Sequence, residues 1–193
     1  MGYKRRREDQ MKTNSIRSIT MTAIMITLII VLGLFPGIPV GFLPVPIILQ
    51  NFGIMLAGEL LGPKRGILAV ALFLVLVALG FPFLSGGNGG LASFVGPTGG
   101  AILSWLVTPL MIGSVLKLTW WRARWWREWL VLFLFGVLWI NLCEIIWLAT
   151  IFHFGFSKAL IAEMVFLPGD VIKASLSVMV ARRLRKILSH QFN

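Results

Sequence analysis

Apolar residues gather into six long runs separated by short polar or Gly- and Pro-rich connections. The runs lie near residues 16–35, 47–62, 66–82, 92–116, 129–152 and 159–187. A helix that crosses a bilayer needs roughly 20 mostly apolar residues. The pattern therefore predicts an all-α integral membrane protein with about six transmembrane helices. Residues 16–193 are expected to form one membrane domain behind a basic segment at residues 1–15.

The composition supports a membrane domain and leaves no room for a separate catalytic domain. Of the 193 residues, 58% are apolar and 13% are charged, whereas an average soluble domain is about 25% charged. The single cysteine, Cys143, lies inside an apolar run, so an intramolecular disulfide is excluded.

The net charge of +11 is distributed as expected for a membrane protein. Lys and Arg residues accumulate in the cytoplasmic connections of such proteins. Placing residues 1–15 in the cytoplasm also places Lys64–Arg65, 117–127 and 182–186 there, and leaves Lys158 outside. We therefore predict that both termini are cytoplasmic and that the protein crosses a bacterial-type cell membrane several times.

The tryptophans between residues 120 and 129 alternate with arginines, a combination that also occurs in proteins that bind single-stranded nucleic acid. Here the cluster falls between two apolar runs on the predicted cytoplasmic side. Trp and Arg at that position are typical anchors at the lipid headgroups. We therefore expect contact with membrane lipid and no nucleic-acid partner.

Two predicted outer connections, residues 35–46 and 82–90, are apolar, uncharged and rich in Pro and Gly. Non-helical backbone near membrane depth is tolerated where protein buries it or where it lines a cavity. These connections are expected to cap a pocket that opens outward. The Gly-Pro turn at residues 62–66 predicts that the second and third runs form a helical hairpin.

Four ionisable residues stand out in the apolar runs, where a charge costs roughly 2.5–3.5 kcal/mol. Glu59 lies near the inner end of its run, close to Lys64–Arg65, which favours an ion pair there. Glu144 has three open interpretations: a hydrogen bond inside the bundle, a protonated acid, or a group that faces a cavity. Asp170 and Lys173 are three residues apart and share a helix face, so the simplest interpretation is an internal ion pair.

Three features favour a ligand site at Asp170 and Lys173. The preceding Pro168 and Gly169 suit the first turn of a helix, whose free N–H groups attract anions. The pair also lies in the outer half of its run, level with the Pro- and Gly-rich connections. A carboxylate and an ammonium together suit a small molecule that carries both N–H groups and an acid.

The sequence offers little for catalysis, so the chain is not expected to be an enzyme. Neither His153 nor His190 belongs to a metal-binding or nucleophilic constellation, and no cofactor or metal is expected. No phosphate-binding G-x-x-x-x-G-K-[ST] motif is present. Any ATP must therefore be used by partner subunits.

Three ordered blocks carry a resemblance to a known family. They are Val45–Gln50 with Leu56–Gly66, Gly80–Gly100, and Phe166–Lys173 continuing to Arg183. From about residue 20 the chain resembles the BioY family, the biotin-specific S components of ECF vitamin transporters. The resemblance implies a six-helix subunit that binds biotin from outside and depends on a transmembrane T component and two ATPase subunits.

The resemblance also implies site residues. Asp170 and Lys173 match the family's Pro-Gly-Asp-x-x-Lys motif, and Asn88 lies in the Gly-rich connection where a polar ligand contact is expected. Gln50 and Phe83 are weaker candidates for the pocket wall.

Small residues in the first helix of the family dock onto the T component. In this chain the nearest equivalents of that pattern are Ala23 with Thr27 and Ser18 with Thr22, and we take Ala23 and Thr27 as the docking candidates. Their small side chains would allow a partner helix to approach closely.

Three alternatives remain open. The first is an S component for another vitamin, which would lack a pocket of biotin's size around the site residues. The second is a membrane scaffold whose buried charges are purely structural. The third is a membrane enzyme, which lacks a catalytic constellation.

Overall fold

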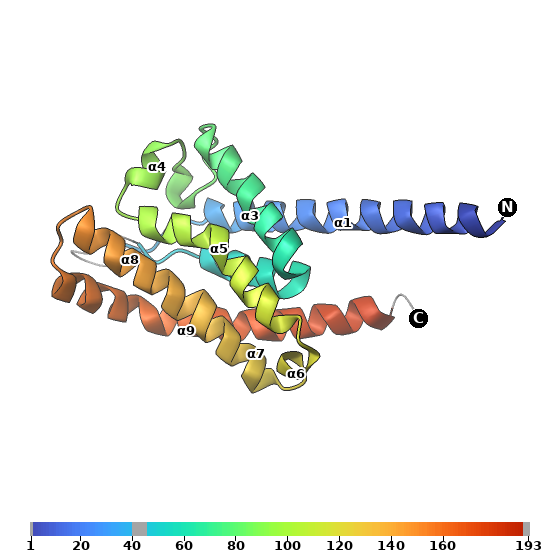
Figure 1. Cartoon of the computed structure of the whole chain (residues 1–193). Helices are drawn as coiled ribbons and strands as arrows, with labels where there is room; N and C mark the ends of the chain where they lie inside the picture. Colours follow the sequence, from blue (N-terminus) through green and yellow to red (C-terminus); the bar gives the residue numbers. More distant parts are fainter. Residues whose placement is uncertain (1, 40–45, 191–193) are drawn as a thin grey trace.

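The computed structural model describes the backbone of residues 2–39 and 46–190. Nearly all of these residues are helical, and the helices pack into a bundle (Figure 1). The described ranges contain isolated β-bridges between Ile38 and Ile47 and between Leu84 and Asn88. The predicted all-α membrane fold is therefore confirmed in class.

In chain order, the helical elements are α1 (Gly2–Leu34), α2 (Gln50–Leu56), the π-helical η1 (Ala57–Leu61), α3 (Gly62–Ala78), the 3₁₀ turn η2 (Ser85–Gly87), α4 (Ala92–Val95), α5 (Gly99–Leu116), α6 (Thr119–Arg122), α7 (Trp125–Leu132), the π-helical η3 (Phe133–Leu138), α8 (Trp139–Thr150) and α9 (Phe156–His190).

In the described part of the chain, five helical segments are long and apolar enough to cross a membrane. They are Ile16–Leu34, Gln50–Ala78, Gly99–Leu116, Trp125–Thr150 and Phe156–Ile187. The second contains two of the predicted runs, and Gly62 interrupts it with a φ of 74°. The chain doubles back there, as the predicted hairpin requires (Figure 1). The number of crossings stays a prediction.

The prediction of one continuous helix over residues 92–116 is wrong. The chain forms the short α4 and then α5, and between them Gly96 is extended with a ψ of 179°. Pro97 follows immediately, and the residue before a proline avoids the α conformation for steric reasons.

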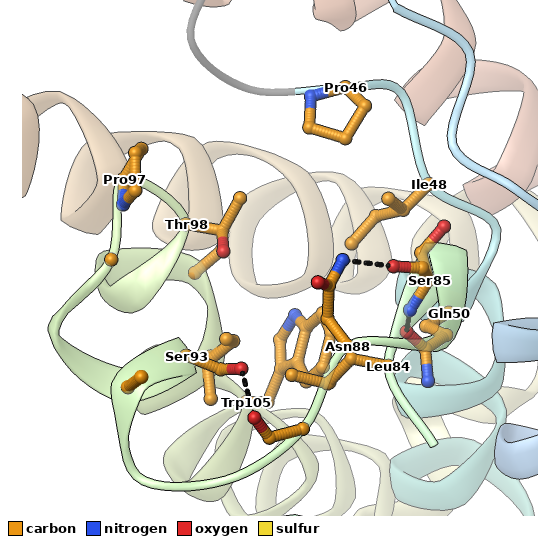
Figure 2. Close-up of a pocket in the computed structure, with 15 residues that line it drawn as sticks. Pro46, Ile48, Gln50, Leu84, Ser85, Asn88, Ser93, Pro97, Thr98 and Trp105 are labelled. Carbon is orange, nitrogen blue, oxygen red and sulfur yellow. Dashed lines mark hydrogen bonds between the residues drawn. The ribbon is translucent and has the colours of Figure 1, made fainter. Parts of the chain in front are cut away.

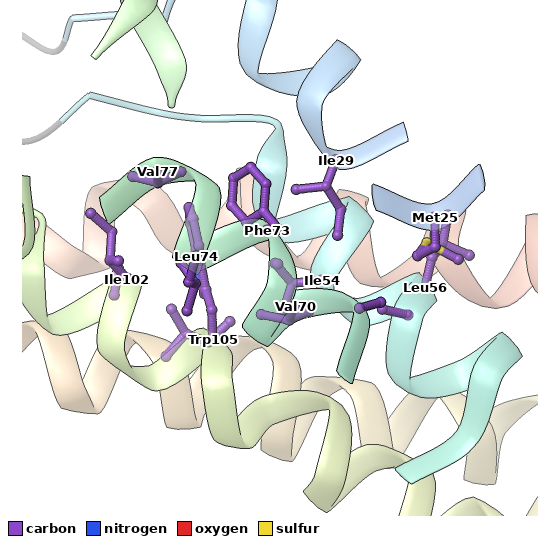
Figure 3. Packing of buried hydrophobic residues seen from close by; sticks show 14 of the residues in the cluster. Met25, Ile29, Ile54, Leu56, Val70, Phe73, Leu74, Val77, Ile102 and Trp105 are labelled. Atoms are coloured by element: carbon purple, nitrogen blue, oxygen red, sulfur yellow. The ribbon is translucent and has the colours of Figure 1, made fainter. Parts of the chain in front are cut away.

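Helix α3 shows how the core is built (Figure 3). Its buried residues Val70, Phe73 and Val77 recur at helical spacing, whereas Leu68 and Leu72 on the opposite face are about half exposed. An apolar exposed face on a helix with a buried apolar face suits contact with lipid.

Glycines allow the helices of the bundle to approach closely. A Cβ atom on Gly58 would lie 2.9 Å from the Cα atom of Pro109 and 3.0 Å from Ile112 in α5. A Cβ atom on Gly113 would fall on the backbone of Pro63. Because lipid provides no hydrophobic drive between helices, such close van der Waals packing contributes much of their association.

Buried carboxylates and arginines join three helices near the end of the bundle where α1 begins and α9 ends. Glu59 is fully buried and pairs with Arg185 at 3.2 Å. Glu128 on α7 pairs with both Arg182 and Arg185. The predicted ion pair of Glu59 is confirmed, but its partner comes from α9 and not from the adjacent Lys64–Arg65.

Arg122 completes this cluster from the connection between α5 and α7. Its guanidinium donates to the Glu59 carbonyl at 3.2 Å, and its own carbonyl accepts from Arg182 at 3.1 Å. Burial, followed by the nearby positive charge of Arg185, lowers the pKa of the Arg122 guanidinium.

The start of α1 and the end of α9 lie at the same end of the bundle (Figure 1). This arrangement agrees with the expectation that both termini share one side of the membrane. The cytoplasmic assignment of that side stays a prediction, as does the boundary between residues 1–15 and 16–193. The backbone of α1 runs through that boundary without a break.

Candidate ligand-binding site

A cavity of about 390 Å³ is lined by residues of the connection 82–90 (Figure 2). We call it the outer cavity. Other lining residues come from α4 and the start of α5, which lie at the end of the bundle opposite the start of α1 and the end of α9 (Figure 1). Residues 46–50 and the loop before α5 complete its wall, as expected for a pocket capped by the Pro- and Gly-rich connections. Residues 40–45 of the first predicted cap lie outside the described residues.

Gln50 holds the connection of residues 82–90, which covers the outer cavity, through hydrogen bonds to its backbone. Its amide nitrogen donates to the carbonyl oxygens of Phe83 at 2.9 Å and Ile29 at 3.3 Å. Its amide oxygen accepts from the backbone N–H of Ser85 at 3.1 Å. Gln50 lines the cavity, and its polar atoms bond to the backbone; its contact with a ligand stays a prediction.

Asn88 lies in the same cavity (Figure 2). Its amide nitrogen donates to the Ser85 carbonyl at 2.8 Å, which holds the side chain against the roof. Phe83 stacks on Phe81 with ring centroids 5.2 Å apart and is not among the described residues that line either cavity. The structure therefore brings Gln50 and Asn88 into one cavity and leaves Phe83 out of its lining.

The outer cavity also has an apolar wall that was not predicted from the sequence. Ile48 and the fully buried Trp105 supply it. The indole N–H of Trp105 donates to the side-chain oxygen of Asn51 at 2.9 Å. A tryptophan in an apolar run gives no signal of this kind, because the pocket forms only when α5 packs against α2.

A second, smaller cavity of about 30 Å³ adjoins the first. We call it the inner cavity. The two share lining residues from the end of the first connection and from the start of α5, namely Pro46, Ile48, Thr98 and Ala101. Polar side chains dominate the rest of the inner wall: Asn51, Asn141, Glu144, Glu163, Asp170 and Lys173.

Asp170 and Lys173 form an ion pair inside the inner cavity. The Lys173 ammonium lies 2.7 Å from one carboxylate oxygen of Asp170, and the Asn141 amide donates to the other oxygen at 3.1 Å. Only 3% of Asp170 and 7% of Lys173 is exposed. The ion pair anticipated from the spacing is confirmed.

The expected helix start at Pro168 is wrong. Helix α9 runs without interruption from Phe156 to His190, with Pro168 inside it. Asp170 is therefore not in the first turn of α9, and the free N–H groups of that helix are not part of the site. Proline is tolerated within membrane helices because neighbouring groups satisfy the freed backbone carbonyl.

Two glutamates also line the inner cavity. Glu144 lines the cavity, which is one of the three interpretations considered for it. Glu163 lines it too and is 5% exposed, although it was not predicted as a site residue. Glu163 precedes Asp170 by seven residues, or two helical turns, so the two side chains lie on the same face of the helix. That spacing was the sequence signal that could have identified Glu163.

Ala23 and Thr27 lie on an exposed face of α1, away from the buried Met25 and Ile29. The Thr27 hydroxyl donates to the Ala23 carbonyl at 3.0 Å, so the hydroxyl group is folded against its own helix. Both positions present small surfaces to a neighbouring helix, and their docking role stays a prediction.

These features define a class of protein: a multi-pass helical membrane protein with a two-part, amphipathic cavity near one end of its bundle. Residues 6–190 match the model of the BioY family. The chain belongs to the BioY family. It is accordingly a multi-pass protein of the cell membrane in a family of transport proteins, and not an enzyme.

Curated relatives and a solved structure agree with this assignment. The chain is 49% identical over 174 residues to the biotin transporter BioY of Lactococcus lactis, covering 89% of this chain and 92% of the relative. It is 40% identical over 181 residues to the biotin transporter BioY of Rhizobium etli, covering 87% and 92%. A crystal structure of the S component for biotin from an ECF-type ABC transporter is 49% identical, with a TM-score of 0.88 over 90% of this chain and 93% of that chain.

Proposed function

We propose that this chain is the biotin-binding S component of an ECF-type transporter and mediates biotin uptake. The observation that carries the proposal is the buried ion pair of Asp170 and Lys173 in the inner cavity, beside the outer cavity that holds Asn88. Family membership and the similarity to biotin transporters support the choice of ligand.

The chemistry of the two cavities suits biotin. Its ureido ring carries two N–H donors and a carbonyl acceptor, its thiophane ring is apolar, and its valerate chain ends in a carboxylate. Asn88, Asp170 and Lys173 offer matching acceptors and donors, and Ile48 and Trp105 offer an apolar wall. The ion pair keeps both charged groups satisfied while the site is empty.

Equilibrium binding of labelled biotin to the purified protein in detergent tests the proposal. Asp170→Asn and Lys173→Met are each expected to weaken binding by about 30-fold or more, because truncating one partner of a buried charge pair costs about 2–5 kcal/mol. Lys158→Met removes an exposed lysine near the start of α9 and serves as the matched control. Unchanged binding in both site variants would contradict the site, and tight binding of a different vitamin would favour another S component.

We further propose that energised transport depends on a T component and two ATPase subunits, which use the ATP. The exposed small residues Ala23 and Thr27 on α1 support a helix-docking face there. Ala23→Trp is expected to abolish co-purification with the T component and leave biotin binding unchanged. Leu72→Trp places the same bulk on an exposed position of α3 and should preserve assembly. Equal assembly in both variants would contradict this docking face.

A further inference from the structure

The inner cavity holds more carboxyl groups than cations. Among the described residues that line it, the titratable groups are Glu144, Glu163, Asp170 and Lys173. At most 9% of any of the four is exposed. The Lys173 ammonium is already engaged with Asp170 at 2.7 Å, so the two glutamates face the cavity without a cation of their own in the described structure.

Glu163 lines this cavity and has one carboxyl oxygen that accepts no hydrogen bond from the part of the chain that the structure describes. Its Oε1 atom is buried and has no hydrogen-bond partner within the described residues. Neither Glu144 nor Glu163 belongs to any of the ion pairs found there. An isolated buried carboxylate is strongly unfavourable, and such a group takes up a proton instead. A protonated carboxyl also gains an O–H donor that a ligand oxygen can use.

The charge balance points the same way. With all four groups ionised, the cavity side chains would sum to a charge of −2, and an anionic ligand would add another negative charge. With protons on both glutamates the side chains sum to zero. The neutral arrangement also places two hydrogen-bond donors next to the ligand.

We propose that Glu144 and Glu163 stand in the inner cavity as neutral carboxylic acids that donate hydrogen bonds to oxygen atoms of the ligand. Binding of anionic biotin therefore requires their protons. This inference rests on the proposed function, because it concerns how the same site recognises its ligand.

The direction of the pH dependence follows from linkage. Raising the pH removes a proton that the complex needs, so affinity falls as the pH rises. Where one proton accompanies the ligand, affinity falls by about tenfold per pH unit. In the acidic direction affinity stays constant until the ligand's own carboxylate takes up a proton.

The test is the dissociation constant of labelled biotin for the purified full-length protein between about pH 6 and 9.5. Glutamine has the shape of the neutral acid and no titratable proton. We therefore expect the double variant with Glu144→Gln and Glu163→Gln to bind biotin with an affinity that does not change between pH 6 and pH 9.5. At pH 9.5 the wild type should bind at least about tenfold more weakly than at pH 6, and the double variant should keep its affinity.

Proton uptake by the wild-type protein gives a second readout that needs no variant. Titrations at about pH 9 in buffers of different ionisation enthalpy should show proton uptake on binding, up to two protons per biotin, one for each glutamate. The elution volume and melting temperature of each sample at each pH confirm that the protein remains folded.

Several outcomes would overturn the inference. The first is a flat pH profile of the wild-type protein. The second is loss of binding by the glutamine variants at pH 6. The third is loss of wild-type binding when choline replaces Na⁺ in the buffer. In the second case the ligand needs carboxylates as acceptors, and in the third a metal cation supplies the missing charge. Biotin binding by the wild-type protein at pH 6 tests the proposed function separately. If the wild-type protein binds no biotin at any pH, the proposed function fails and the inference fails with it.

Discussion

Replacing Lys173 with methionine tests whether the buried pair is an ion pair on which the empty fold depends. Methionine preserves most of the side-chain volume but removes the ammonium that lies 2.7 Å from Asp170. Asp170, which is 3% exposed, would keep only the hydrogen bond from Asn141 at 3.1 Å. Breaking a buried pair on one side costs about 3–5 kcal/mol.

For a chain of this length, each kcal/mol lowers the melting temperature by about 2–4 °C. Lys173→Met should therefore melt about 6–20 °C below the wild type in the absence of ligand. Removing both charges with Asp170→Asn and Lys173→Met together should recover much of this loss, because no unpaired charge remains.

Thermal unfolding of the purified proteins in one detergent measures these differences. Lys64→Met, which removes an exposed lysine from α3, is the matched control and should melt like the wild type. The reasoning is refuted if Lys173→Met melts like the control, or if the double variant melts no higher than the single one.

Three further predictions concern packing, the cavity roof and the inner cluster. Gly113→Val places atoms on the backbone of Pro63, and overpacking of about 1–3 kcal/mol or more should lower the melting temperature; wild-type melting would contradict this. Gln50→Leu removes the hydrogen bonds that hold residues 83–85 and should speed biotin dissociation by about tenfold, measured by chase with unlabelled biotin; an unchanged rate would count against a fastening role. Glu128→Gln removes the charge partner of Arg182 and one of the two partners of Arg185. It should lower the melting temperature while leaving biotin affinity within about twofold, since no residue of the cluster is among the described residues that line the two cavities; a parallel loss of affinity would show that the two regions are coupled.

Helix positions were predictable where the apolar pattern decides them. The predicted run at residues 129–152 corresponds to the continuous helical segment Trp125–Thr150. The broken helix at Gly96 was less predictable, because a Gly-Pro step inside an apolar run fits either a kinked helix or a turn. Pro168 predicted a helix start that the structure does not have, because the packed environment of α9 tolerates a proline within the helix.

The site was predictable in so far as its signals are local. Asp170 and Lys173 share a helix face by their spacing, and their charges stand out in an apolar run. Trp105 and Asn51 have no local signal, because their roles depend on the packing of α5 against α2. Glu163 had only the two-turn spacing from Asp170, which becomes meaningful once α8 brings Glu144 to the same cavity.

The central claim is that this chain by itself binds biotin in the joined outer and inner cavities. Titration of the purified wild-type protein with biotin, without any partner subunit, tests it most directly. The account predicts saturable binding of one biotin per chain that an excess of thiamin or riboflavin does not displace, because neither carries a ureido ring with a valerate chain. The absence of biotin binding by well-folded protein, or equal displacement by those vitamins, would contradict it.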